Sequence, residues 1–248
     1  AVAVFPTLAT VAFKKNELVE NVSHTIRQIL FFIVPATVLL LILRAQIIRS
    51  ILGSGMFDWE DTILTINTLG FFSISLFAQA LIPLLTRVFY ARHNATTPFI
   101  VGLISAVINI ILAWFLAGTG LGVAGLALSF SIANIIQFML LWLILRLEIG
   151  DMDEWKILIS TLKFSFAGLA LGVTTQGMKY LVADYFDLNR LWGIFSQGLL
   201  AGLLGLFVYI AFCSMMRSEE LGEFWAAIKR RLKWDKLDTN DQGEARGI

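Results

Sequence analysis

The chain has few of the residues from which enzymes and metal proteins build their sites. Among its 248 residues there is one cysteine, Cys213, and there are two histidines, His24 and His93, both of which we expect in loops. One cysteine excludes a disulfide framework and a cysteine-rich metal site, and two loop histidines argue against an imidazole-based site. The apolar segments also lack any acid–base pair, metal-ligand cluster or Ser/His/Asp arrangement. We therefore expect no enzymatic activity, no cofactor and no metal.

Charged residues are also scarce, at 15% of the chain, where soluble domains have about 25%. Hydrophobic residues make up 58%, and the mean hydropathy is +0.79. Most of them fall in six long stretches, each of at least the ~20 residues that a helix needs to cross a bilayer. Lipid offers no hydrogen bonds to a bare backbone, and runs this uniform do not suit the alternating strands of a barrel.

The predicted fold is therefore all-α, a polytopic helical membrane protein. Its six full transmembrane helices are expected at residues 28–48, 62–86, 97–117, 121–145, 157–180 and 191–213. If residues 14–27 are cytoplasmic, all but four of the 19 lysine and arginine residues lie on the cytoplasmic side. Since cytoplasmic loops retain cations during insertion, both ends of the chain are predicted to be cytoplasmic. The four exceptions are Arg44, Arg49, Lys179 and Arg190.

Two segments lie outside the spans. Residues 1–13 are apolar but too short to cross a bilayer, so we interpret them as the end of a preceding, truncated transmembrane helix kinked near Pro6, with an interfacial helix as the alternative. Residues 14–27 would then form a cytoplasmic connection. Residues 218–248 are expected to form a cytoplasmic amphipathic basic helix and a disordered tail, the helix lying on anionic headgroups or ending in solvent. Its apolar face carries Leu221, Phe224, Trp225, Ile228 and Leu232.

Polar residues form stripes inside the second, third and fourth spans. At the helical period of about 100° per residue, the polar side chains of each span share one face. In hydrocarbon, amide groups must face another helix or a wet cavity. Two interpretations stay open, namely packing contacts between helices and the walls of a hydrophilic transport cavity. The candidate cavity residues are Thr68, Ser75, Gln79, Thr86, Asn109, Asn134 and Gln137.

The fifth and sixth spans carry glycine-rich faces that look complementary. Small residues one helical turn apart let two helix backbones approach closely. Such smooth faces can equally leave a shallow groove that holds a lipid chain. The candidate groove residues are Gly168, Gly172, Gly198, Gly202 and Gly205.

One apparent nucleotide motif is rejected. The segment from Gly120 to Gly125 matches G-x-G-x-x-G, but a dinucleotide site needs a preceding strand and a carboxylate some 20 residues further on. Neither is present, so we expect a tight turn between two spans.

The loop between the second and third spans reads Arg87-Val-Phe-Tyr-Ala-Arg-His-Asn-Ala-Thr-Thr-Pro98. Thr97 and Pro98 suit a helix start, as a capping hydroxyl followed by proline at the first helical position. Similar short motifs are AVFPT at 3–7, GSGMF at 53–57 followed by DWEDT, and GVAGLALS at 122–129. Together, in this order, they make the chain resemble the MurJ/MviN-type lipid II flippases of the multidrug/oligosaccharidyl-lipid/polysaccharide exporter superfamily. Asn94 departs from the aspartate that many relatives carry.

The resemblance implies fourteen helices in two bundles plus a terminal pair. This chain would supply the end of the eighth helix, a four-helix part of the C-terminal bundle at 28–147, and the terminal pair with a lipid groove at 157–213. The cytoplasmic loop would contribute two arginines that attract pyrophosphate or headgroups, or that merely anchor the topology. Its motif residues are Arg87, Phe89, Tyr90, Arg92, Thr97 and Pro98.

The implied function is translocation of lipid II, the lipid-linked peptidoglycan precursor, across the bacterial cytoplasmic membrane by alternating access. The implied partners are lipid II or a similar polyprenyl-pyrophosphate-linked glycan, membrane lipids and the missing N-terminal bundle of the same protein, with no nucleic acid. The alternatives are another exporter of the superfamily, for lipid-linked oligosaccharides or drugs, and a non-transporting membrane scaffold.

Overall fold

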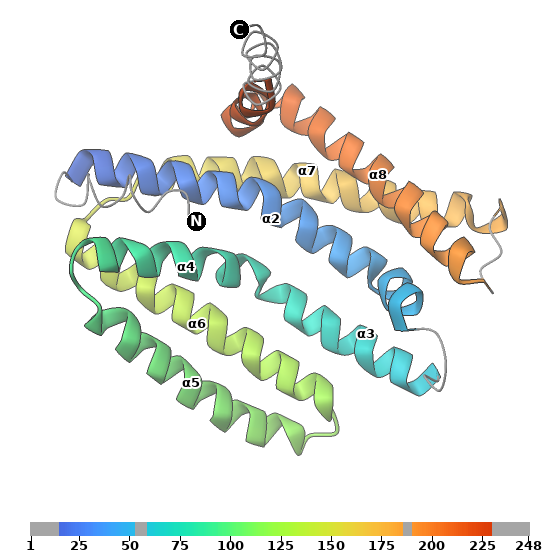
Figure 1. Cartoon of the computed structure of the whole chain (residues 1–248), viewed down its shortest axis with the longest axis horizontal. Coiled ribbons are helices and arrows are strands. Elements are labelled where there is room, and N and C mark those ends of the chain that lie inside the picture. Colours follow the sequence, from blue (N-terminus) through green and yellow to red (C-terminus); the bar gives the residue numbers. More distant parts are fainter. Residues whose placement is uncertain (1–14, 53–58, 186–189, 230–248) are drawn as a thin grey trace, which may run out of the picture.

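The structure, a computed structural model, describes residues 15–52, 59–185 and 190–229, and these ranges contain helices and no strand. The helices are α2 (Lys15–Leu52), α3 (Trp59–Ile74), α4 (Leu76–Ala91), α5 (Thr96–Ala117), α6 (Val123–Ile149), α7 (Glu154–Leu181) and α8 (Leu191–Met215), with a 3₁₀ turn η2 (Ala183–Tyr185) after α7 (Figure 1). Residues 219–229 are helical as well. The predicted helix end at 1–13 and the predicted tail after residue 229 lie outside the described residues.

Five of these helices, α2, α5, α6, α7 and α8, are each long and apolar enough to cross a membrane. The prediction placed one continuous span at 62–86, and this continuity is wrong. The structure has two shorter helices there, α3 and α4, which meet at Ser75 with a bend of 43°. Taken as one broken span, the pair gives a sixth crossing. The all-α membrane fold is confirmed, with one of its spans interrupted.

Helix α2 begins well before the predicted span. Residues 14–27 were expected to connect two spans with His24 in a loop, but Lys15 already starts the helix and His24 lies on it. The cause is an apolar stripe. Leu18, Val22 and the isoleucine at position 26 follow one another every four residues, and each is at most 1% exposed. Such a stripe holds a helix against the core even where its other face is polar.

Helix α2 lies in the middle of the bundle. It packs against α3 and α4 on one side and against α7 and α8 on the other, while α6 packs on α3, α4 and α5 (Figure 1). The start of α2, the α4–α5 turn and the α6–α7 connection share the left-hand end in Figure 1. We call this the charged end, because ion pairs such as Arg92–Glu148 and Arg146–Glu154 lie there. The turn between α5 and α6 lies at the opposite end.

The α5–α6 turn is the hairpin that the sequence predicted. Gly120 and Gly122 have φ of 76° and 53°, values in which side chains other than glycine are strained. Two glycines therefore allow the chain to reverse within five residues. The dinucleotide interpretation of this segment has no support in the fold.

Much of the outer surface is apolar. Trp114 on α5, Val173 on α7 and Phe207 on α8 are 85%, 75% and 70% exposed. A water-soluble protein rarely leaves so many large apolar side chains uncovered. This surface suits lipid, and it places α5 at the outside of the bundle.

Candidate functional site

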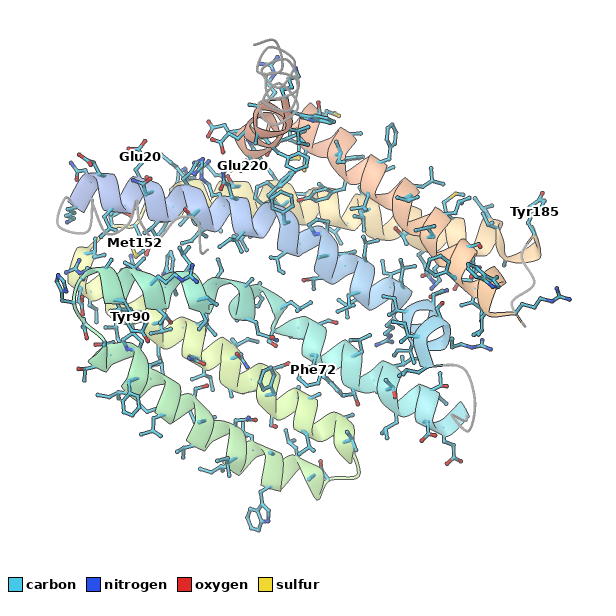
Figure 2. All side chains as sticks on the ribbon, in the orientation of Figure 1. Glu20, Phe72, Tyr90, Met152, Tyr185 and Glu220 are labelled. Atoms are coloured by element: carbon cyan, nitrogen blue, oxygen red, sulfur yellow. The ribbon has the colours of Figure 1, made fainter. Side chains whose placement is uncertain are left out.

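The most distinctive polar feature is the break between α3 and α4. In a continuous helix the amide of Ser75 would donate to the carbonyl of Phe71, but here it donates to Phe72 O at 3.3 Å. The carbonyl of Phe71 instead accepts the hydroxyl of Ser131 on α6 at 2.7 Å. Since an unpaired carbonyl at membrane depth is costly, Ser131 stabilises the break. Close by, the labelled Phe72 (Figure 2) packs edge-on against Phe130 with ring centroids 5.3 Å apart.

A directed chain of hydrogen bonds runs through this break. The amide of Gln79 donates to Ser75 Oγ at 2.8 Å, and Ser75 Oγ donates to Ser131 Oγ at 3.0 Å. Ser131 then donates to the Phe71 carbonyl, and the Ser75 hydroxyl also lies 3.2 Å from the Phe72 carbonyl, a second acceptor for its one hydrogen. Both serines are at most 1% exposed. Two predicted site residues, Ser75 and Gln79, thus bond to each other directly, and Ser131, which the sequence reasoning missed, connects them to α6.

A second cluster of polar side chains joins α5 to α6. Ser129 Oγ lies 3.1 Å from Asn109 Oδ1, and Ser105 Oγ donates to the carbonyl of Ala133 at 2.8 Å. The amide of Gln137 lies beside Gly102, 3.7 Å from where a Cβ would be. Asn109 and Gln137 therefore both lie at the contact between these two helices.

The remaining candidate cavity residues are less connected. Thr68 and Asn134 bond back to carbonyls of their own helices, at 2.8 Å each, and the Thr86 side chain is half-buried. The seven candidates thus fall into two interhelical groups and three separate positions. Their role as cavity walls stays a prediction.

The loop motif is ordered by Asn94. Its Oδ1 accepts the amide of Thr97 at 3.1 Å, and its Nδ2 donates to Thr97 Oγ1 at 2.9 Å. Asn94, the residue before the N-cap position Ala95, therefore caps the first turn of α5 through its side chain, and the prediction that the Thr97 hydroxyl caps the helix is wrong because the helix begins at Thr96, two residues before the predicted first helical position. Pro98, expected at the first helical position, is the third residue of α5. An asparagine and an aspartate can accept the same amide, so the departure at position 94 keeps the cap.

Around this loop, Phe89 is fully buried and Tyr90 is half exposed (Figure 2). Arg92 lies 3.6 Å from Glu148 on α6, so its charge is partly balanced. Arg87 is half-buried, and its Nη1 is enclosed without a hydrogen-bond partner among the described residues.

The glycine faces of α7 and α8 pack mainly on α2. Cβ atoms added at Gly168 and Gly172 would lie 3.1 and 3.2 Å from α2 side chains, and those at Gly198 and Gly202 would both lie 3.2 Å from them. Of the five candidate groove residues, Gly205 alone faces α7. We expected the glycine faces of α7 and α8 to pack on each other. This expectation is wrong for four of the five glycines, because α2 lies against both helices.

Two apolar grooves flank α2. One, of about 600 Å³, runs between α2 and α7 past Gly168 and Gly172 to Gln176. The other, of about 320 Å³, lies between α2 and α8 beside Gln46 and Gly198. Gly168, Gly172 and Gly198 thus line these grooves and also lie against α2.

Two cationic side chains, Lys179 of α7 and Arg44 of α2, lie near one another. Lys179 Nζ donates to the carbonyl of Ile42 at 3.0 Å, and its charge is repelled by that of Arg44. The Arg44 guanidinium lies over Gly70 of α3, 2.5 Å from where a Cβ would be. From the sequence, both cations could be identified only as exceptions to the charge bias, because no pattern in it indicates which helix lies opposite each side chain.

A family model described as "Lipid II flippase MurJ" matches residues 1–216. A probable lipid II flippase MurJ of Thermotoga maritima is 30% identical over 216 residues, which are 87% of this chain and 42% of that protein. Lipid II flippase MurJ of Thermosipho africanus is 28% identical over 211 residues, 85% of this chain and 40% of that one.

A solved structure of lipid II flippase MurJ in an inward closed conformation is also similar. It has a TM-score of 0.66 and 27% sequence identity, and the match covers 84% of this chain and 41% of that one. The chain thus spans about two fifths of the length of the proteins it resembles.

Proposed function

We propose that this chain, which belongs to the lipid II flippase MurJ family, is the C-terminal part of a flippase that moves a lipid-linked peptidoglycan precursor across the bacterial cytoplasmic membrane. The observation that carries the proposal is the family match over residues 1–216, which includes all six membrane crossings. The proposed activity moves a lipid and makes or breaks no bond. Because the chain spans about two fifths of its relatives, we assign the activity to its assembly with the N-terminal bundle of the same protein.

The broken helix supports a transport role. Alternating access requires one bundle to move against another, and discontinuous spans are common in transporters. In the proposed mechanism, the angle between α3 and α4 changes at Ser75 while Ser131 keeps the Phe71 carbonyl bonded. We propose that this joint, with Gln79 attached to it, lines the path of the polar headgroup. Asn109 and Gln137 would face the same path from α5 and α6.

The apolar grooves beside α2 suit the polyprenyl tail of such a substrate. Their walls are almost wholly apolar, and glycines at 168, 172 and 198 keep them open. We propose that the terminal helices α7 and α8 hold the tail here, against α2. The charged end, with Arg87 and Arg92, would face the cytoplasm, in keeping with the positive-inside rule.

The test is rescue of cells depleted of their own lipid II flippase. A full-length gene containing this sequence is expected to restore growth and lipid II export, whereas residues 1–248 alone are not. Export of other lipid-linked oligosaccharides, with no export of lipid II, would identify another exporter. Absence of rescue by a protein that is well expressed in the membrane would contradict the proposal.

Cysteine labelling distinguishes a transporter from a scaffold. In a protein whose Cys213 is replaced by alanine, we expect single cysteines at Gln79 and Asn109 to react with a water-soluble maleimide. A cysteine at Ala133, which is 2% exposed, is the dry control. If the first two positions are as unreactive as the control, they are packing contacts and line no wet path.

A further inference from the structure

The helix at residues 219–229 lies beyond the part of the chain that the family model matches. It contacts α2 and α7 through its acidic residues. Glu220, which is 4% exposed, accepts hydrogen bonds from Arg27 at 3.0 Å, Ser160 at 3.1 Å and Ser218 at 2.7 Å. The label of Glu220 in Figure 2 marks this contact beside α2. A buried carboxylate with three donors fixes the helix firmly in place.

The other two acids of the helix are engaged in the same way. Glu219 accepts a hydrogen bond from Arg27 at 3.1 Å, and Glu223 lies 2.7 Å from His24 Nε2 and 2.9 Å from Gln28 Nε2. Burial opposes ionisation of Glu223, but hydrogen bonds from His24 and Gln28 outweigh it and hold its pKa below the ordinary value. All three negative charges of residues 219–229 are therefore turned towards α2 and α7.

Part of the predicted apolar face is also covered by protein. Leu221 is 6% exposed, and the Phe224 ring packs edge-on against Phe32 with centroids 5.5 Å apart. The expectation of a helix that rests on headgroups through its whole apolar face is therefore too simple. Trp225 remains half exposed.

Beside Trp225 the helix and α8 enclose a groove of about 460 Å³. Phe207, Ile210 and Ala211 of the spanning helix form one wall, and Leu221, Gly222 and Trp225 form the other. Because Phe207 lies within a membrane-spanning helix and is 70% exposed, the groove opens to lipid. A tryptophan at its edge is typical of the boundary between hydrocarbon and headgroups.

Two cations lie at the two ends of this segment. Arg217 and Lys229 are exposed and form no ion pair with any residue that the structure describes. The sequence adds Arg230, Arg231 and Lys233 directly after Lys229. Residues 219–229 thus turn their acids towards α2 and α7, and the exposed Lys229 lies one helical turn beyond Trp225, which lines the groove.

We propose that the groove between α8 and residues 219–229 binds an anionic phospholipid. One acyl chain lies against Phe207 and Ile210, Trp225 packs at the level of the glycerol, and the phosphate group lies near Lys229, one helical turn beyond Trp225. A cation near a membrane surface favours anionic lipid by about 1 kcal/mol, which corresponds to a preference of about five-fold for each residue. This inference does not depend on transport.

The test uses the protein in phosphatidylcholine nanodiscs that contain a minor fraction of phosphatidylglycerol. Bromine on the acyl chains of either lipid quenches nearby tryptophan, and the difference from a Trp225→Phe variant isolates Trp225. At equal amounts of brominated lipid, phosphatidylglycerol is expected to quench Trp225 several-fold more strongly. Lys229→Gln should lower that preference about five-fold, whereas Lys156→Gln, at an exposed lysine paired with Asp153, should leave it unchanged.

Each other outcome contradicts the proposal. Equal quenching by both lipids would mean an ordinary interfacial tryptophan without headgroup selectivity. Quenching by neither lipid would mean that another part of the protein covers the groove. The comparison within the unaltered protein needs no folding control, and helix content by circular dichroism checks the variants.

Discussion

At the scale of single residues, the molecule depends on polar groups that satisfy the backbone where helices are interrupted. Ser131 contributes one hydroxyl to the Phe71 carbonyl and accepts another from Ser75. Neither hydroxyl reaches solvent, so no water replaces a lost bond. Asn94 performs the same task at the start of α5.

Ser131→Ala is therefore expected to destabilise the protein. The substitution leaves a buried carbonyl without a donor, which costs about 1–3 kcal/mol in the free energy of unfolding. Thermal or chemical unfolding in detergent measures the effect. The matched control is Ser165→Ala, at an exposed position on α7 where about 0.5 kcal/mol or less is expected. Equal stability of the two variants would show that the hydroxyl does not hold the break.

Two glycines of the spans should respond oppositely to alanine. A Cβ at Gly125 would lie 2.9 Å from the backbone oxygen of Leu116, which cannot move without shifting α5. Gly125→Ala should therefore cost about 1–3 kcal/mol of stability. A Cβ at Gly177 meets nothing within 4 Å. Gly177→Ala should be neutral or gain up to about 1 kcal/mol from helix propensity, and the same unfolding measurement separates the two.

At the scale of elements, the sequence predicted every crossing because length and apolarity alone decide which segments span a bilayer. It could not predict the break at Ser75, because the partner that stabilises the break, Ser131, is 56 residues away. It also assigned the glycines of α7 and α8 to each other, because no local pattern indicates that α2 lies against both. For the site residues, the sequence could predict which helix face carries each side chain and how deep it lies in the membrane, but not which residue it contacts.

The docking of residues 219–229 on α2 should weaken in acid. The pKa of Glu223 in the folded protein is below its ordinary value of 4.5, so its ionised form favours docking. This contribution is fully present above pH 4.5 and is lost as the pH falls through the lowered pKa. A spin label on a cysteine at Ala227, in a Cys213→Ala background, should become more mobile over that interval.

Glu223→Gln is the control for this measurement, since it removes the titrating group and keeps its shape. The variant should show greater mobility at neutral pH and a smaller change on acidification. If both proteins gain mobility equally over the same pH interval, other groups control the docking, and the role assigned to the His24–Glu223 contact is wrong.

At the scale of the whole molecule, the proposed mechanism makes this chain one of two moving parts. α2 packs both on the broken span and on the terminal helices α7 and α8. The break at Ser75 and the grooves beside α7 and α8 therefore have α2 as a common neighbour. Alternating access requires a second bundle for this one to move against, and the chain spans about two fifths of the length of its relatives. We therefore predict that the assembly of both bundles transports the lipid and that this chain alone does not.

Reconstituted flipping of lipid II is the measurement that tests this claim most directly. Fluorescent lipid II in proteoliposomes is expected to become accessible from the opposite leaflet when the N-terminal bundle of the same protein is present with residues 1–248. Residues 1–248 alone should give the rate of protein-free liposomes. Flipping by residues 1–248 alone, or no flipping of lipid II by the folded assembly, would contradict the account.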